Sequence, residues 1–304
     1  MSLTKKRKTV LLTGARGRLG SELRRLLPSS DLELVPFSRT RGEGIFELSD
    51  LLTPGLWEHA DVILHAAWST VPMVSERNAG AEWHHDFPLL LTLLQAAARR
   101  TPKPHFIFFS SGGSVYGNAG TTPSRETDSL RPIGWHGFAK AQAEALLQEF
   151  CAKADVPFAI LRISNPYGFP SANDKPQGII PILIQAALHD QCFRIWGDGL
   201  ARKDFLHAND FAAAIRGIIS GGVTGVFNLA HGESHTVKEI VETVEETLGR
   251  KVPLEHAAAY PWDVNDSRLD NSKLMNIIGW KPEVDVHEGV RLCVESFRRV
   301  AGKL

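Results

Sequence analysis

The chain has 304 residues, of which 43% are hydrophobic and 22% are charged, and its 34 basic side chains equal its 34 acidic ones. A chain of this length and composition can bury a full core, and it suits one large α/β unit or a nucleotide-binding domain with a smaller partner. The balanced charge excludes a global field that would draw nucleic acid or an acidic membrane to the surface.

The first predicted element is a short buried strand over residues 9–13. Its apolar run is too short for the core of a signal peptide or for a membrane span, and no later segment reaches that length without charges. We therefore expect no membrane segment and a cytoplasmic location. Cys151, Cys192 and Cys293 lie far apart in the sequence. Their spacing predicts reduced thiols and no metal site.

A glycine-rich turn follows this strand. Gly14, Gly17 and Gly20 form the pattern G-x-x-G-x-x-G. In such a turn the first glycine permits the tight bend, the second lets the backbone approach a pyrophosphate, and the third lets the following helix pack closely. The amides at the start of that helix then face the phosphates. The pattern lies between a predicted strand and a predicted helix and includes Arg16 and Leu19, so we predict a dinucleotide-binding turn.

Arginines follow the second predicted strand, over residues 32–37. An acidic residue at the end of this strand would hold the adenosine ribose hydroxyls of NAD. This chain has Ser38 and Arg39 there, with Arg16 in the glycine turn, and guanidinium groups can pair with a 2′-phosphate. We therefore predict a nicotinamide cofactor, NAD or NADP, with a preference for NADP. The alternative is that these arginines are solvated surface residues.

Strand and helix patterns alternate from there to Asn165. We predict further strands over 61–67, 105–109 and 158–163, and helices over 21–27, 89–100 and 138–153. The almost wholly apolar segment 105–109 is typical of a strand in the middle of a parallel sheet. The alternation predicts an α/β fold with a Rossmann-type doubly wound parallel sheet, which binds ligands at the carboxyl ends of its strands.

Prolines and glycines interrupt regular structure after Asn165. We therefore predict a dinucleotide-binding domain over residues 1–166, with returns to its sheet at about 205–230. A smaller mixed α/β lobe over 167–204 and 231–304 is expected to bind the substrate.

Several short motifs occur in order along the chain. They are LHAA at 64–67, FSSGGSVYG at 109–117, RISNPYG at 162–168, WGDG at 196–199, KDFLH at 203–207 and FNLA at 227–230. With the glycine turn, they make the chain similar to the extended short-chain dehydrogenase/reductase family, in its NAD-dependent epimerase/dehydratase, UDP-galactose 4-epimerase-like branch. The resemblance implies an enzyme that acts on a nucleotide-diphosphate sugar, and a homodimer. It covers the chain from Val10 to about Pro282.

The resemblance also implies where the cofactor lies. It places the adenine near Asp50 and Leu51, and the nicotinamide ribose near Ala66, Ala67 and Lys140.

The same resemblance implies a substrate site further along the chain. Asn165 and Arg268 would contact the substrate's diphosphate, and Ile179 would line the nucleotide pocket within segment 177–181. Lys203 stands where the family usually has arginine; it offers a positive charge without the bidentate fork.

The chain departs from the family at the catalytic residues, which form the motif Tyr-x-x-x-Lys. Lys140 is present, but His136 stands four residues earlier, a spacing that puts both side chains on one helix face. The usual serine or threonine partner falls on a glycine, and either Ser111 or Ser114 is a candidate to take its place. Asp86 replaces an asparagine of the family.

Two interpretations follow. In the first, His136 is the general acid/base beside Lys140, aided by Ser111 or Ser114. The Lys140 ammonium and an oxidised nicotinamide would lower the pKa of the imidazole and favour the neutral base. An NAD(P)-dependent nucleotide-sugar epimerase or ketoreductase results, because the acidic pair typical of dehydratases is absent. In the second, the chain binds a cofactor without turnover, as a sensor or scaffold.

Overall fold

The computed structural model describes residues 7–53, 59–169 and 177–301, and the chain divides into two compact units. The first unit comprises Met1–Ser111, Gly134–Arg162 and Ile215–Phe227. The second unit comprises Gly112–Ile133, Ile163–Ala214 and Asn228–Leu304. The predicted division into a cofactor-binding domain and a substrate-binding lobe, with a boundary at residue 166, stays a prediction.

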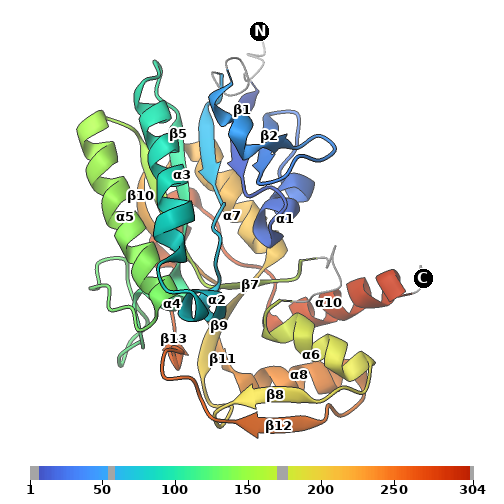
Figure 1. The fold of residues 1–304 in the computed structure, drawn as a ribbon. Coiled ribbons are helices and arrows are strands. Elements are labelled where there is room, and N and C mark those ends of the chain that lie inside the picture. The colour runs from blue at the N-terminus through green and yellow to red at the C-terminus, as the bar shows by residue number, and fades with distance from the viewer. Residues whose placement is uncertain (1–6, 54–58, 170–176, 302–304) are drawn as a thin grey trace. The chain divides into compact units, whose positions relative to one another are not determined.

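The first unit is built on a seven-stranded sheet with the order β10-β6-β5-β4-β1-β2-β3 (Figure 1). β1 runs parallel to β2 and β4, and β4 runs parallel to β5. The order from β3 to β6 is that of the Rossmann fold, so the predicted fold class is confirmed. The strands are β1 Lys8–Thr13, β2 Leu32–Ser38, β3 Phe46–Glu47, β4 Val62–His65, β5 His105–Ser111, β6 Phe158–Ile163 and β10 Gly225–Leu229.

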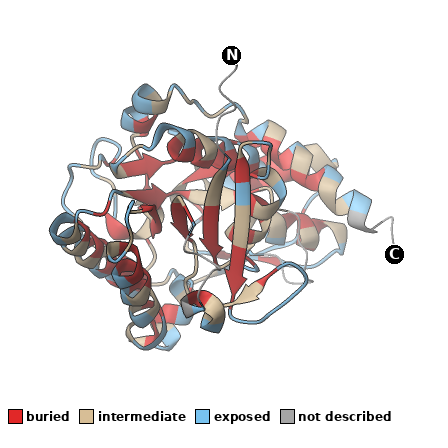
Figure 2. Cartoon of the chain, turned by 90° about the horizontal axis from the view of Figure 1, so that it is seen from above, coloured by how far each residue is buried: buried red, intermediate tan, exposed pale blue. Residues whose placement is uncertain are grey.

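Helices cover both faces of this sheet, whose strands are largely buried (Figure 2). They are α1 Arg18–Leu26, α2 Pro72–Arg77, α3 Ala81–Ala98, α5 Trp135–Ala154 and the 3₁₀ helix η1 Leu48–Leu52. α7 Ala208–Gly221 begins in the second unit and ends in the first. α3 and α5 lie side by side on one face, where Leu94 and Leu147 pack in the core with Phe106 and Phe108 of β5 (Figure 1).

The predicted starts of three helices were too late. α1 begins at Arg18 rather than at residue 21, and α5 begins at Trp135 rather than at residue 138. α3 begins at Ala81, not at residue 89, directly after Gly80 in a left-handed conformation (φ 89°). Pro88 is exposed and lies inside α3. It has no backbone N–H, so one helical hydrogen bond is missing there, but the helix continues through it. The corrected starts place His136 within α5 and Glu82 within α3.

The second unit contains two smaller sheets. β9 Arg202–His207 pairs with β7 Asn165–Tyr167, β11 Ser234–Thr236 and β13 Asp266–Ser267. β8 Phe193–Trp196 pairs with β12 Leu254–Ala257. β10 lies in the seven-stranded sheet, whereas residues 205–207 lie in β9.

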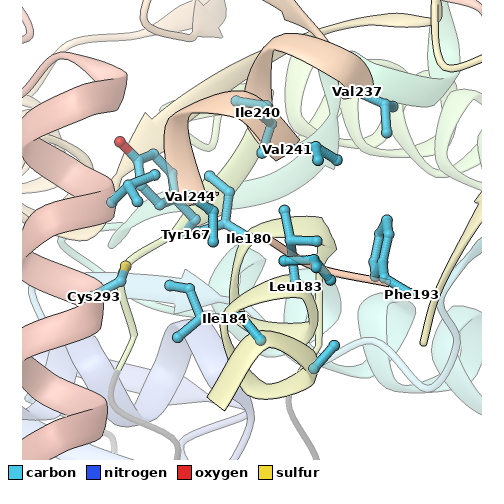
Figure 3. Close-up of a cluster of buried hydrophobic side chains, with 14 of the residues drawn as sticks. Tyr167, Ile180, Leu183, Ile184, Phe193, Val237, Ile240, Val241, Val244 and Cys293 are labelled. Carbon is cyan, nitrogen blue, oxygen red and sulfur yellow. The ribbon is translucent and has the colours of Figure 1, made fainter. Parts of the chain in front are cut away.

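Three helices of the second unit enclose its apolar core. Tyr167, Ile180, Leu183, Ile240 and Val244 meet there (Figure 3). The helices of this unit are α4 Gly112–Val115, α6 Ile179–Leu188, α8 Val237–Leu248, α9 Ser272–Ile278 and α10 Val286–Ala301, and α6, α8 and α10 pack around the core. In the described parts of both units, no helix has the length and apolar character needed to cross a membrane.

Candidate active site

The glycine turn is packed so closely that side chains cannot replace its glycines. Gly14 follows β1 with a φ of 72°, and a Cβ there would lie 2.7 Å from the backbone nitrogen of Ala67. A Cβ at Gly20, in the first turn of α1, would lie 2.2 Å from the carbonyl oxygen of Gly14. The first amides of α1 have no intrahelical acceptor. The turn therefore forms a side-chain-free cradle with amides available to an anion, which fits a dinucleotide pyrophosphate.

The segment after β2 carries Arg39, one of the two arginines predicted to pair with a 2′-phosphate. Ser38 is buried, whereas Arg39 is exposed and makes no hydrogen bond or ion pair with the described residues. Arg16 reaches this segment, because its Nη1 donates to Oγ1 of Thr40 at 2.9 Å. The structure thus brings Arg16 to the same segment as Arg39, where no carboxylate ends the strand.

Asp50 and Leu51, the residues expected near the adenine, lie in η1. Arg41 forms an ion pair with Oδ2 of Asp50 at 2.6 Å, and the Glu47 amide donates to the same oxygen at 2.9 Å. Leu51 is buried. Asp50 is therefore already occupied by a cation and a backbone amide in this structure.

The end of β4 lies beside the end of β1. Oγ1 of Thr13 hydrogen-bonds Nδ1 of His65 at 2.8 Å and accepts from the Ala67 amide at 3.3 Å. His65 is fully buried, and burial, followed by the charge of Lys140, lowers its pKa to about 3. Ala66 and Ala67 follow as a half-buried segment next to the glycine turn.

Lys140 is buried on α5. Its Nζ donates to the carbonyl oxygen of Phe109 at 2.7 Å and lies 3.6 Å from the centroid of the Trp68 ring. Burial lowers the pKa of Lys140 to about 7, while the charges of Asp86, Glu144 and Glu82 act in the opposite direction. A buried cation is thus held by a carbonyl, an aromatic face and nearby acids.

His136 lies one turn before Lys140 in the same helix and is also buried. Burial, and then the charge of Lys140, lowers the pKa of His136 to about 3, so the imidazole is neutral at physiological pH. The predicted effect of Lys140 on this pKa is present, but burial is the larger cause. Nδ1 of His136 lies 3.4 Å from Oγ1 of Thr70.

Buried carboxylates accompany this pair. Asp86 accepts from the amide and the hydroxyl of Ser69, at 2.8 and 2.6 Å, and burial raises its pKa. Glu144, one turn after Lys140, forms a buried ion pair with Arg162 at 2.8 Å and accepts from Oγ of Ser110. This ion pair fixes α5 against β6, and the Lys140 ammonium has no direct carboxylate partner among the described residues.

The candidate serines lie in different units. Ser111 ends β5 in the first unit, and Ser114 lies in α4 in the second. Both are half-buried, and neither hydroxyl hydrogen-bonds to a described residue. Their neighbour Ser110 is instead committed to Glu144.

The predicted diphosphate residues come from strands of one sheet in the second unit. Asn165 begins β7, Lys203 lies in β9 and Arg268 follows β13, and both β7 and β13 pair with β9. Nδ2 of Asn165 donates to the carbonyl oxygen of Asp204 at 2.9 Å. Ile179 is half-buried at the start of α6, outside this sheet.

Both cations of this set already have acidic partners. Lys203 forms an ion pair with Asp263 at 3.0 Å and donates to the carbonyl oxygen of Val264. Arg268 pairs with Asp266 at 2.8 Å and donates to the carbonyl oxygen of Gly120 at 2.7 Å. A bound phosphate must therefore compete with carboxylates for these side chains.

Thr70, Glu82 and Trp68 were missed by sequence reasoning. Glu82 lies one turn before Asp86 on α3, a relation that a helix predicted from residue 89 could not show. Acidic side chains are favoured in the first turn of a helix. With the start of α3 predicted at residue 81, Glu82 would have been recognised as such a residue.

The chain matches the NAD dependent epimerase/dehydratase family over residues 10–230. It is 33% identical to the dTDP-4-dehydro-6-deoxyglucose reductase of Escherichia coli over 193 residues, which are 63% of this chain and only 61% of the reductase. The fold is similar to the UDP-glucose 4-epimerase of Thermus thermophilus in complex with NAD, with a TM-score of 0.85, 26% identity and coverage of 95% and 99% of the two chains. It is also similar to the UDP-glucose 4-epimerase of Thermotoga maritima with UDP-glucose, with a TM-score of 0.86, 26% identity and coverage of 96% and 99%.

Proposed function

This chain belongs to the NAD-dependent epimerase/dehydratase family, and on that premise we propose that it is an NAD(P)-dependent enzyme acting on a nucleotide-diphosphate sugar. The reaction is hydride transfer at a ring carbon, in the manner of an epimerase or a ketoreductase. The observation that carries the proposal is the pair of buried residues His136 and Lys140 on one face of α5. The epimerases that bind NAD or UDP-glucose and share this fold support it.

The first unit carries the features that suit the cofactor. The cradle around Gly14, Gly17 and Gly20 would hold the pyrophosphate, with Leu19 in the helix that follows. Ala66, Ala67 and Lys140 would hold the nicotinamide ribose, and Asp50 and Leu51 would lie near the adenine. When bound, the cofactor supplies the acceptor or donor of the hydride. Free Arg39, with Arg16 at the same segment and no acid at the end of β2, supports NADP over NAD.

His136 takes the place of the family's tyrosine in this proposal. Its neutral imidazole accepts the proton of the sugar hydroxyl during oxidation and returns it during reduction. The hydroxyl oxygen becomes a carbonyl oxygen as its carbon is oxidised, so its proton grows more acidic and a weakly basic imidazole suffices. Lys140 orients the ribose, and the hydroxyl of Ser111 or Ser114 would position the substrate oxygen.

The second unit carries the features that suit the sugar nucleotide. Asn165, Lys203 and Arg268 would contact the diphosphate, and Ile179 would line the nucleotide pocket. Guanidinium and ammonium groups suit phosphate oxygens, and the present partners Asp263 and Asp266 hold both cations in place until a phosphate competes for them.

A panel of UDP- and dTDP-linked sugars, including 4-keto sugars, tests the proposal with both NAD and NADP. An epimerase interconverts two sugars without net change in the cofactor, whereas a ketoreductase consumes reduced cofactor in proportion to product. The proposal predicts turnover in one of these two patterns. Absence of turnover on the whole panel, by protein that binds the cofactor, would contradict it.

A second candidate function is cofactor binding without turnover, as in a sensor or scaffold. The low pKa of His136, about 3, favours it, because such an imidazole is a weak base in the ligand-free protein. Calorimetric titration distinguishes the two functions. A sensor binds the dinucleotide but has no affinity for sugar nucleotides, whereas the enzyme binds both.

The resemblance to the family also leads us to propose a homodimer. The outer faces of α3 and α5 carry exposed apolar side chains, with Leu91 37%, Phe138 41% and Trp135 45% exposed. Such neighbouring apolar groups are typical of a surface that a second copy covers. Phe138→Glu is expected to yield monomers in sedimentation velocity, while Leu200→Glu, a matched change at an exposed leucine of the second unit, leaves dimers intact. A wild-type monomer would contradict the homodimer.

A further inference from the structure

A chain of buried polar side chains leads from α3 to Nδ1 of His136. Glu82 lies in the first turn of α3, and its side chain is wholly buried. Its Oε1 accepts hydrogen bonds from the hydroxyls of Thr70 and Ser75, each at 2.5 Å. Thr70 in turn lies 3.4 Å from Nδ1 of His136. All four residues belong to the first unit.

The donors along this chain are determined by counting hydrogens. A threonine hydroxyl has one hydrogen, and a carboxylate oxygen can only accept. The hydrogen of Thr70 is therefore used on Glu82, where the short bond to a charged acceptor is the stronger of the two that Thr70 makes. The Thr70 oxygen has only lone pairs left for His136, so Nδ1 must be the donor.

This assignment determines which nitrogen of His136 is free. A neutral imidazole carries one hydrogen, so a hydrogen on Nδ1 leaves Nε2 with a lone pair. Among the described residues, Nε2 has no hydrogen-bond partner. The bond to Thr70 is longer than an average N–H···O bond, so it biases the tautomer rather than locking it.

We propose that Glu82, acting through Thr70, is a positioning residue that sets the tautomer of His136, with the proton on Nδ1 and Nε2 left to exchange a proton with the substrate. The tautomer stands on the buried contacts alone; only the role of Nε2 rests on the proposed function. Glu82 does not touch the substrate or cofactor in this account. It acts by fixing the direction of one hydroxyl.

The surroundings of His136 suit this arrangement. The charge that acts on the pKa of His136 is that of Lys140 on its own helix, and the charges of Asp86, Glu144 and Glu82 act in turn on Lys140. Lys140 repels a proton on the ring, and Glu82 reaches it only through Thr70. A single bridging hydroxyl thus decides where the one ring hydrogen lies.

The test is ¹⁵N NMR of the imidazole nitrogens in the full chain, because protonated and bare ring nitrogens resonate far apart. The His136 signals are assigned by their loss in His136→Phe. We expect wild type to show a protonated Nδ1 and a bare Nε2. Thr70→Val should shift the populations toward Nε2–H, whereas Thr70→Ser keeps the wild-type pattern. Ser75→Ala is the matched control, since it removes the other hydroxyl on Oε1 of Glu82 without touching His136.

Glu82→Gln is a second, independent test of the tautomer. A glutamine amide can donate to the Thr70 oxygen, which turns the Thr70 hydrogen toward Nδ1 and favours the Nε2–H tautomer. This variant keeps the buried volume, so it serves if Thr70→Val fails to fold. A protonated Nε2 in wild type, or a Glu82→Gln spectrum identical to that of wild type, would overturn the proposal.

Kinetics separate this inference from the proposed function. If the protein turns over a nucleotide sugar, Thr70→Val should lower kcat by about tenfold or more with KM nearly unchanged. Thr70→Ser, which keeps the hydroxyl, should have the kcat of wild type. If no substrate is turned over, the proposed function fails while the NMR result still decides the tautomer. Equal kcat in wild type and Thr70→Val, with turnover present, would contradict the role of Nε2.

Discussion

His136 and Lys140 lie one helical turn apart on α5, both buried, and the charge of Lys140 is second only to burial in lowering the pKa of His136. The pair keeps the four-residue spacing of the family's tyrosine and lysine, but the lysine has a different effect on the acid/base group. A nearby ammonium stabilises an ionised phenol, whereas it destabilises a protonated imidazole. His136 is thereby kept as a neutral base.

The low pKa of His136 predicts a pH dependence of stability. The folded-state pKa is about 3 and the ordinary pKa of a histidine is 6.5, so the unfolded state binds more protons between these values. The free energy of unfolding should therefore fall as the pH falls through this window. In His136→Phe the decline should be shallower, by about 2 kcal/mol between pH 6.5 and pH 4.5. Urea denaturation at a series of pH values measures it.

His84→Phe, at an exposed histidine of α3, is the control for this effect and should follow the wild-type curve. His65 contributes with the same sign in both proteins, so the difference between the variants isolates His136. Parallel curves for wild type and His136→Phe would show that the imidazole is not buried in its neutral form.

Gly20→Ala should damage both stability and cofactor binding. The new Cβ would lie 2.2 Å from the carbonyl oxygen of Gly14, which is backbone and cannot rotate away. We expect a loss of about 1–3 kcal/mol in the free energy of unfolding. The melting temperature and the dissociation constant of the dinucleotide measure the two effects. Gly120→Ala, where a Cβ meets nothing within 4 Å, should change stability by less than about 0.5 kcal/mol.

Arg39→Ala should separate the two dinucleotides. Because Arg39 is exposed and unpaired among the described residues, its loss leaves no buried partner behind. We expect the dissociation constant of NADP to rise by about 10- to 100-fold and that of NAD to stay nearly constant. Arg99→Ala, at the other end of α3 from its first turn, is the charge-matched control. An equal effect on NAD and NADP would remove the preference for NADP.

Arg268→Gln should weaken sugar-nucleotide binding. The guanidinium is held by Asp266 and by the carbonyl oxygen of Gly120, which orients its fork before a phosphate arrives. We expect KM for the sugar nucleotide to rise by about tenfold or more, with no change in dinucleotide affinity. Arg291→Gln removes a comparable surface pair with Glu288 on α10 and should leave KM unchanged. A KM that is insensitive to Arg268→Gln would place the diphosphate elsewhere.

The parts of the fold that depend on local sequence patterns could be predicted. Buried strands such as 105–109 are continuous apolar runs, and the glycine turn follows directly from the spacing of three residues. The start of α3 was not predictable from apolar periodicity, because Glu82 and Asp86 are buried polar residues on the face that periodicity would make apolar. Their burial depends on Thr70, Ser75 and Ser69, which come from outside that helix.

In the candidate site, too, the contacts set by local spacing could be predicted and those set by tertiary packing could not. The i, i+4 spacing of His136 and Lys140 places them on one face from sequence alone. Thr70 lies 66 residues from His136, and only the packing of the segment after β4 against α5 brings their side chains together. Likewise, Asp263 lies 60 residues from Lys203, and only the pairing of β13 with β9 brings the two together, whereas Asp266 is two residues from its partner Arg268.

In the proposed function, His136 exchanges a proton with a nucleotide sugar during hydride transfer. The most direct test is single-turnover kinetics on a sugar that the wild-type protein uses, comparing wild type with His136→Phe and His136→Tyr. We expect the Phe variant to bind both ligands normally and to lose about 100-fold or more in rate, and the Tyr variant, which has the family's own residue beside Lys140, to retain turnover. A Phe variant that turns over as fast as wild type would contradict this role of His136.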